Sequence, residues 1–133
     1  MAERVSIAAV VANGSELRIE LEVPERRPLR LKILQPVELA EEFEANDLFS
    51  CLLKARISLE EKGIVLCCQG SRPIVFPSGM QRQMGDGRYA YVLADGEFSA
   101  ASTEVDIFAP ADRWEVGSVA DQKDMVMRYF GFS

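Results

Sequence analysis

The chain has 133 residues, of which 48% are hydrophobic and 27% are charged, a balance typical of one folded domain rather than a disordered segment. Its 21 acidic and 15 basic residues give a net charge of −6, which argues against general binding to the phosphate backbone of nucleic acids. The chain contains no histidine, so the side chain that most often serves as a general base or metal ligand near neutral pH is missing. We therefore expect a single domain over residues 1–133 and no general nucleic-acid binding.

Two alternating segments near the start of the chain predict a β-hairpin. Residues 5–12 and 15–23 place an apolar side chain at every second position, as a half-buried strand requires. Asn13-Gly14 between them favours a tight turn, because both residue types tolerate a positive φ. The same alternation at residues 29–33 predicts a third strand.

The next segments predict helical structure. Residues 37–45 fit a short helix or a frayed first turn. A stronger helix is predicted over residues 48–62, with Asn46 or Asp47 as its N-cap. Gly63 is a typical C-terminal stop for this helix.

The second half of the chain predicts shorter elements. The continuous apolar run at residues 64–68 predicts a buried central strand, and residues 89–94 predict a further strand. Residues 105–108 fit another short element. Ser118 is the predicted cap of a last helix.

This order of elements predicts an α+β fold. We expect a single layer of mainly antiparallel sheet with about five strands, and two main helices packed on one face. No apolar segment approaches the roughly 18 residues that cross a bilayer, and no secretory signal is expected. The three cysteines suggest no disulfide framework, which fits a reducing compartment. We therefore expect a cytoplasmic protein without membrane contact.

Residues 67–88 differ most from the rest of the chain, because they hold four of the nine glycines and two of the six prolines. Glycine amides and arginine side chains bind phosphate or carboxylate well, so this loop is a candidate site for a small anion. The candidate ligand-binding residues, all within residues 69–88, are Gly70, Ser71, Arg72, Ser78, Gly79, Gly85, Gly87 and Arg88. The alternative is an ordered loop packed by its own apolar side chains, among them Met80 and Met84.

No complete catalytic or metal-binding motif is present in the sequence. Cys67 and Cys68 lack a histidine that would activate a thiol, and adjacent strand residues face opposite ways, so a structural role is expected. Ser78 belongs to a turn signal and does not complete a nucleophile elbow. We predict no catalytic residue, no metal site and no cofactor, which favours a non-enzymatic function.

Five acidic residues lie within ten positions that contain no basic residue. They are Glu38, Glu41, Glu42, Glu44 and Asp47. If residues 38–42 form a helical turn, these carboxylates share one edge and offer a docking face to a basic protein partner. The alternative is a solvated run of charges that serves only solubility.

The glycine-rich region carries the pattern G-[AS]-R…P-S-G-M…M-x-x-G-R-x-A-Y. In this chain the pattern corresponds to Gly70, Ser71, Arg72, Pro77, Ser78, Gly79, Met80, Met84, Gly87, Arg88, Ala90 and Tyr91. With this pattern, residues 47–110 resemble a family of small bacterial proteins of unknown function. The resemblance implies a bacterial protein and no particular activity. The size of the chain also suits the immunity or accessory proteins that are encoded beside bacterial toxins.

Two functional hypotheses follow from these observations. The first is a small acidic, non-enzymatic binding protein, in the form of an immunity-type inhibitor of a basic bacterial toxin. The alternative is a small-anion-binding protein or enzyme that uses the loop at residues 69–88. The oligomeric state stays open, because the aromatic residues 129–132 fit either the core of the protein or a partner.

Overall fold

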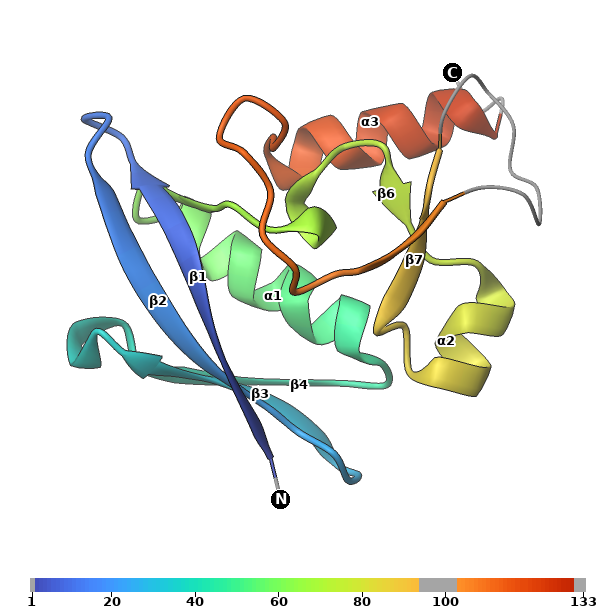
Figure 1. The fold of residues 1–133 in the computed structure, drawn as a ribbon, viewed down its shortest axis with the longest axis horizontal. Helices are drawn as coiled ribbons and strands as arrows, with labels where there is room; N and C mark the ends of the chain where they lie inside the picture. Colours follow the sequence, from blue (N-terminus) through green and yellow to red (C-terminus); the bar gives the residue numbers. More distant parts are fainter. Residues whose placement is uncertain (1, 94–102, 131–133) are drawn as a thin grey trace.

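The computed structural model describes residues 2–93 and 103–130, which form an α+β fold with two antiparallel sheets (Figure 1). The strands are β1 (Glu3–Val11), β2 (Glu16–Val23), β3 (Leu29–Gln35), β4 (Glu41–Ala45), β5 (Ile64–Leu66), β6 (Val75–Phe76), β7 (Tyr89–Val92) and β8 (Glu104–Asp106). The helices are α1 (Leu48–Glu60), α2 (Gly79–Gly85) and α3 (Val119–Tyr129), with the short 3-10 turns η1 (Val37–Leu39) and η2 (Gln69–Ser71). The predicted α+β class is confirmed. A small second sheet and an additional helix accompany a five-stranded sheet, which contains β4 in place of the strand predicted at residues 89–94.

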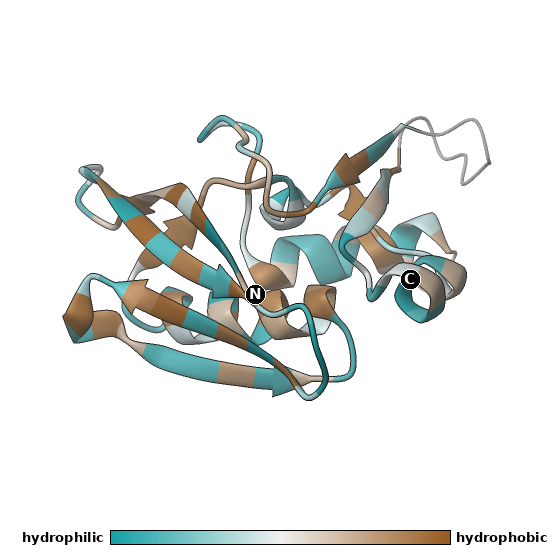
Figure 2. Ribbon diagram, turned by 60° about the horizontal axis from the view of Figure 1, so that its bottom comes forward, coloured by the Kyte–Doolittle hydropathy of each residue, from teal (hydrophilic) through white to brown (hydrophobic). Residues whose placement is uncertain are grey.

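The large sheet has the strand order β4-β3-β2-β1-β5, and its neighbouring strands are antiparallel. The predicted hairpin is confirmed as β1 and β2, in which Ile7 is paired with Ile19, and the predicted third strand is β3. Hydrophobic and hydrophilic residues alternate along these strands in Figure 2, so one face of the sheet is buried and the other meets solvent. The buried face includes Ile7, Ile19, Leu21, Leu31, Ile33 and Phe43.

Helix α1 covers the buried face of the large sheet and supplies the other half of the core. Its buried apolar residues are Leu48, Phe49, Cys51, Leu52, Ala55 and Leu59. Asp47 is the N-cap, since its carboxylate accepts a hydrogen bond from the Ser50 amide at 2.7 Å. Gly63 follows the helix with a φ of +74°, a left-handed conformation that favours glycine. The predicted start of α1 is confirmed, and the helix ends at Glu60, two residues before the predicted end, with Gly63 in the turn that follows.

The expected helix at residues 37–45 was wrong, because most of this segment is the edge strand β4. Its side chains alternate: Phe43 is buried, while Glu42 and Glu44 face solvent opposite Lys32 and Arg30 of β3. This pairing buries one aromatic ring and places unlike charges side by side. Tertiary contact with β3 therefore decides the conformation of a segment whose local pattern is ambiguous.

Strand β5 was expected at the centre of the sheet, but it lies at the edge beside β1. Its continuous apolar sequence has another cause. Residues 109–111 run along the chain just after β5, where the Ala111 amide donates to the Cys67 carbonyl at 3.1 Å and the Gln69 amide donates to the Ala109 carbonyl at 2.8 Å. This segment covers residues 67–69, and α1 packs against β5, where Ile64 and Leu66 are buried and Val65 is half-buried.

The glycine-rich stretch is not a structureless loop. It contains η2, β6 and α2, and it leads into β7 of the small sheet, whose strand order is β6-β7-β8. The strand predicted at residues 89–94 is confirmed as β7, which ends at Val92; Leu93 is outside the strand, and Ala94 lies outside the described residues. The short element predicted at 105–108 overlaps β8. In Figure 1, α2 and β7 lie at the opposite end of the molecule from the turn between β1 and β2.

Helix α3 begins where the sequence predicts it. The Ser118 hydroxyl accepts a hydrogen bond from the Asp121 amide at 3.0 Å, and the Asp121 carboxylate accepts one from the Ser118 amide at 3.0 Å. One polar residue of this helix, Gln122, is only 2% exposed. Within residues 2–93 and 103–130, no helix combines the length and the apolar character needed to cross a membrane.

Candidate functional site

The first group of predicted loop residues is buried between α1 and the segment after β8. Gly70 sits so close to Leu52 and Ile107 that a Cβ atom would lie 2.5 Å from the Leu52 side chain. Ser71 is fully buried, and its hydroxyl lies 3.4 Å from the Cys68 sulfur. These two residues are packed in the interior and do not reach the surface.

The two arginines of the predicted anion site bind carboxylates of the protein itself. Arg88 donates two hydrogen bonds to Asp106, at 2.9 and 3.0 Å, and two to Glu3, at 3.0 and 3.2 Å. These two carboxylates raise the pKa of Arg88. Arg72 donates to the Gln69 side chain at 2.8 Å and lies 3.6 Å from Glu115. An external anion would therefore compete with carboxylates already in place.

The remaining loop residues build α2 and its exit. Ser78 is the N-cap of α2, and it forms a capping box with Gln81. Gly79 and Gly85 are exposed, with nothing within 4 Å of the place of a Cβ atom. Gly87, with a φ of +70°, packs closely against α1. The structure thus distributes the eight predicted residues over three separate environments.

The five predicted acidic residues do not share a helical edge. Glu41 accepts a hydrogen bond from Ser58 of α1 at 2.8 Å, whereas Glu44 forms an ion pair with Arg30 at 2.8 Å on the solvent face of the sheet. Glu42 is exposed on the strand and Glu38 on η1. Asp47 is buried at the start of α1. The prediction that these residues lie on one helical turn is wrong, because Glu41, Glu42 and Glu44 belong to strand β4.

The three cysteines are buried and free. Burial raises the pKa of each thiol above its ordinary value. Nearby cations oppose this rise but do not offset it. Neutral buried thiols are poor nucleophiles, which agrees with the structural role expected for Cys67 and Cys68. Among the described residues, no group of three or more carboxylates and thiols is arranged to hold a metal ion.

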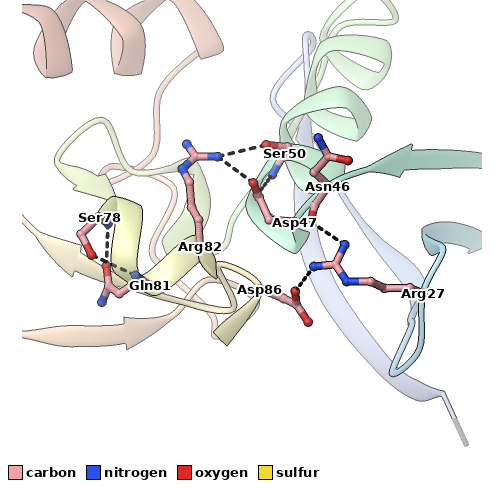
Figure 3. A network of polar contacts seen from close by, with 8 residues as sticks. All are labelled: Arg27, Asn46, Asp47, Ser50, Ser78, Gln81, Arg82 and Asp86. Atoms are coloured by element: carbon pink, nitrogen blue, oxygen red, sulfur yellow. Dashed lines mark hydrogen bonds and ion pairs between the residues drawn. The ribbon is translucent and has the colours of Figure 1, made fainter. Parts of the chain in front are cut away.

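A polar network fixes α2 against α1 (Figure 3). Arg82 of α2 donates to the Asp47 carboxylate at 3.0 Å and to the Ser50 hydroxyl at 3.0 Å. Its guanidinium also lies 5.2 Å from the ring centres of both Phe49 and Phe76. Because the Asp47 carboxylate also caps α1, one buried acid positions two helices.

The same network extends to the connection between β2 and β3. Arg27 donates to the Asn46 carbonyl at 3.0 Å and forms an ion pair with Asp86 at 2.5 Å, as Figure 3 shows. The Asp86 carbonyl in turn accepts a hydrogen bond from the Leu48 amide at 2.5 Å. A hollow of about 520 Å³ opens beside this network, but its cations Arg27 and Lys54 already donate to groups of the protein.

The opposite side of α2 presents a surface of large side chains that we call the Met/Tyr surface, formed by Met80, Met84, Tyr89 and Tyr91. Met80 is 73% exposed, Met84 is 83% exposed and Tyr89 is 50% exposed. With Ser78, Gln81, Gly85 and Glu104, these residues line a hollow of about 340 Å³. Exposed apolar side chains gathered in this way mark surfaces that bind other molecules.

Sequence reasoning assigned Met80 and Met84 to loop packing and did not single out Tyr89 or Glu104. The sequence nevertheless contains a signal for helix α2. The methionines are four residues apart, which places them on one face of a helix, and Ser78-x-x-Gln81 is the pattern of a capping box. The neighbourhood of Glu104 depends on strand pairing and has no local signal.

A comparison of the chain with models of protein families and with curated protein sequences finds no match. The case for a function therefore depends on the geometry of the described residues.

Proposed function

We propose that the protein is a non-enzymatic binding protein that recognises another protein through the Met/Tyr surface. One observation carries this proposal: the two most exposed large apolar side chains of α2, Met80 and Met84, lie beside Tyr89 on a helix that is held firmly in place. Met and Tyr are enriched at protein interfaces, and a fixed surface loses little conformational entropy on binding.

The polar groups that would serve catalysis or anion binding are engaged inside the protein. Arg88 binds two carboxylates, Ser78 caps a helix, and the Cys67 and Cys68 thiols are buried with a raised pKa. These engagements favour the binding hypothesis over the anion-binding alternative. They do so by giving these four side chains a structural role within the fold.

The preferred partner is a basic protein. The chain carries a net charge of −6, and attraction between opposite charges speeds and directs association. The acidic residue Glu104 lines the hollow of the Met/Tyr surface, and the described residues that line this hollow include no cationic side chain. The specific form of the proposal is an immunity-type inhibitor of a basic bacterial toxin, which also suits the small size of the chain.

The experiment that tests this proposal is affinity capture from a lysate of the source organism with matched variants. The double variant Met80→Ser and Met84→Ser removes the apolar part of the surface. The control, Met125→Ser and Met127→Ser, changes two partly exposed methionines of α3 by the same chemistry. Both variants are first checked by thermal unfolding, because only folded proteins are informative.

We expect one basic protein to be retained by the wild type and by the α3 control, and to be lost from the α2 double variant. Raising the salt concentration is expected to weaken this retention, because salt screens the attraction between the two proteins. Equal retention by all three proteins would overturn the assignment of the interface to the Met/Tyr surface.

A further inference from the structure

The hollow of the Met/Tyr surface has a defined construction. Tyr89 and Tyr91 are two positions apart on β7, so they lie on the same face of the small sheet. Glu104 of β8 is paired directly with Tyr91, which places its carboxylate beside that ring. Met80 and Met84 of α2 line the same hollow. Aromatic rings, thioethers and one carboxylate therefore converge from three elements.

The lining matches the chemistry of a cation with an apolar stem. An arginine or lysine side chain packs its methylene groups against apolar surface and keeps its charge at a polar group. The faces of tyrosine rings attract cations, and a carboxylate pairs with them. One oxygen of Glu104 accepts a hydrogen bond from Gln81 at 2.9 Å, which orients the carboxylate. The second oxygen accepts no hydrogen bond from residues 2–93 or 103–130 and is the one we assign to a ligand.

We propose that this hollow receives a cationic side chain of the basic protein partner, with arginine preferred over lysine. The proposal rests on the function proposed above and names the contact at its centre. Arginine is preferred because its planar, weakly hydrated guanidinium stacks on aromatic rings while it binds a carboxylate. The volume of about 340 Å³ is sufficient for one such side chain with part of its backbone.

The methyl groups of Met80 and Met84 allow a direct test by NMR on the intact protein. The protein is labelled with ¹³C at the methionine methyl groups and titrated with acetyl-arginine amide. Acetyl-citrulline amide is the matched probe, because it has nearly the same shape and no charge. Met125 and Met127 of α3 serve as internal controls, since they lie outside the hollow.

We expect the signals of Met80 and Met84 to move and saturate with acetyl-arginine amide at millimolar concentration, while those of the α3 methionines stay in place. Acetyl-citrulline amide is expected to leave all four signals unchanged. The variant Glu104→Gln should weaken binding of the arginine probe about threefold, as for an exposed ion pair. Glu42→Gln, which changes an exposed acid of β4, should leave binding unchanged.

Three results would overturn the inference. The arginine and citrulline probes could act equally, which would indicate an apolar site without charge recognition. Glu104→Gln could bind as well as the wild type. The Met80 and Met84 signals could instead move with protein concentration, which would mean that a second copy of the chain covers the surface. If lysate capture still depended on Met80 and Met84, the proposed function would stand without this inference; if it did not, the function itself would fail.

Discussion

Gly70 and Gly79 lie nine positions apart in the same glycine-rich stretch, yet their surroundings differ completely. A Cβ atom on Gly70 would lie 2.5 Å from the Leu52 side chain and 3.2 Å from Ile107. A Cβ atom on Gly79 would meet nothing within 4 Å. Both glycines were candidates for binding an anion through their backbone, and the contacts of Gly70 give it a packing role instead.

Gly70→Ala is therefore expected to lower the free energy of unfolding by about 1–3 kcal/mol, because the added methyl group overpacks a buried site. Gly79→Ala is the matched control and should change this free energy by less than about 0.5 kcal/mol. Urea unfolding followed by circular dichroism measures both. Equal stability of the two variants would contradict the packing role of Gly70.

At the level of secondary structure, local signals predicted the elements that depend on local chemistry. The hairpin follows from alternation around Asn13-Gly14, and α1 follows from its apolar spacing and the Asp47 cap. Strand β4 could not be predicted in this way. Its alternating acids also fit a helix, and pairing with β3, from Ile33 with Glu41 to Leu29 with Ala45, decides the outcome.

The candidate site shows the same division between local and distant information. Helix α2 carries a local signal in Ser78-x-x-Gln81, but the surrounding glycines and prolines indicate a loop. Arg82 contacts Asp47, 35 positions away, and Arg88 contacts Glu3, 85 positions away. Contacts between residues so far apart cannot be recognised in a short segment of the sequence. The sequence therefore locates the unusual stretch without revealing which of its residues bind within the protein.

The cap of α2 provides a prediction that separates a structural role of Ser78 from a binding role. Ser78→Ala should remove about 0.5–2 kcal/mol of helix stability, because the Gln81 amide loses its acceptor. Ser78→Asp should keep the cap, since aspartate is an equally good N-cap residue. Amide hydrogen exchange at residues 80–85 measures the effect. Faster exchange is expected for Ser78→Ala alone.

An anion-binding Ser78 would give the opposite result for aspartate. A carboxylate at that position would repel an anion, whereas loss of the hydroxyl would remove only one donor. Weak inorganic phosphate binding that survives in Ser78→Ala and disappears in Ser78→Asp, with no change in hydrogen exchange, would contradict the capping role.

On the scale of the whole molecule, a buried polar cluster connects α1, α3 and the glycine-rich stretch. Arg56 of α1 is 2% exposed, and it donates to the Gly70 carbonyl at 3.0 Å, to the Gln122 side chain at 2.6 Å and to the Gly117 carbonyl at 3.3 Å. Gln122 of α3 donates in turn to three backbone carbonyls. Burial lowers the pKa of Arg56, because its charge is removed from water.

Sequence patterns do not predict this buried polar cluster. Arg56 stands next to the apolar stripe of α1 and Gln122 stands on the inner face of α3, and neither residue type suggests burial on its own. The two residues are 66 positions apart. Their hydrogen bonds satisfy carbonyl groups of η2, which lies between the two sheets, and of the segment that leads to α3, so they connect these two parts of the chain.

Arg56→Met is expected to lower the free energy of unfolding by about 2–4 kcal/mol. The substitution keeps an unbranched apolar stem, but it removes the Arg56 donor from the buried Gln122 amide oxygen and from the partly buried Gly117 carbonyl. Arg128→Met is the control: Arg128 is 71% exposed in an ion pair within α3, and its loss should cost less than about 0.5 kcal/mol. Urea unfolding measures both variants, and faster hydrogen exchange along α3 in Arg56→Met would locate the damage. If Arg56→Met unfolds at the same urea concentration as the wild type, the free-energy cost of burying the Arg56 charge must equal the gain from its hydrogen bonds. The cluster would then determine the path of the chain without adding to its stability.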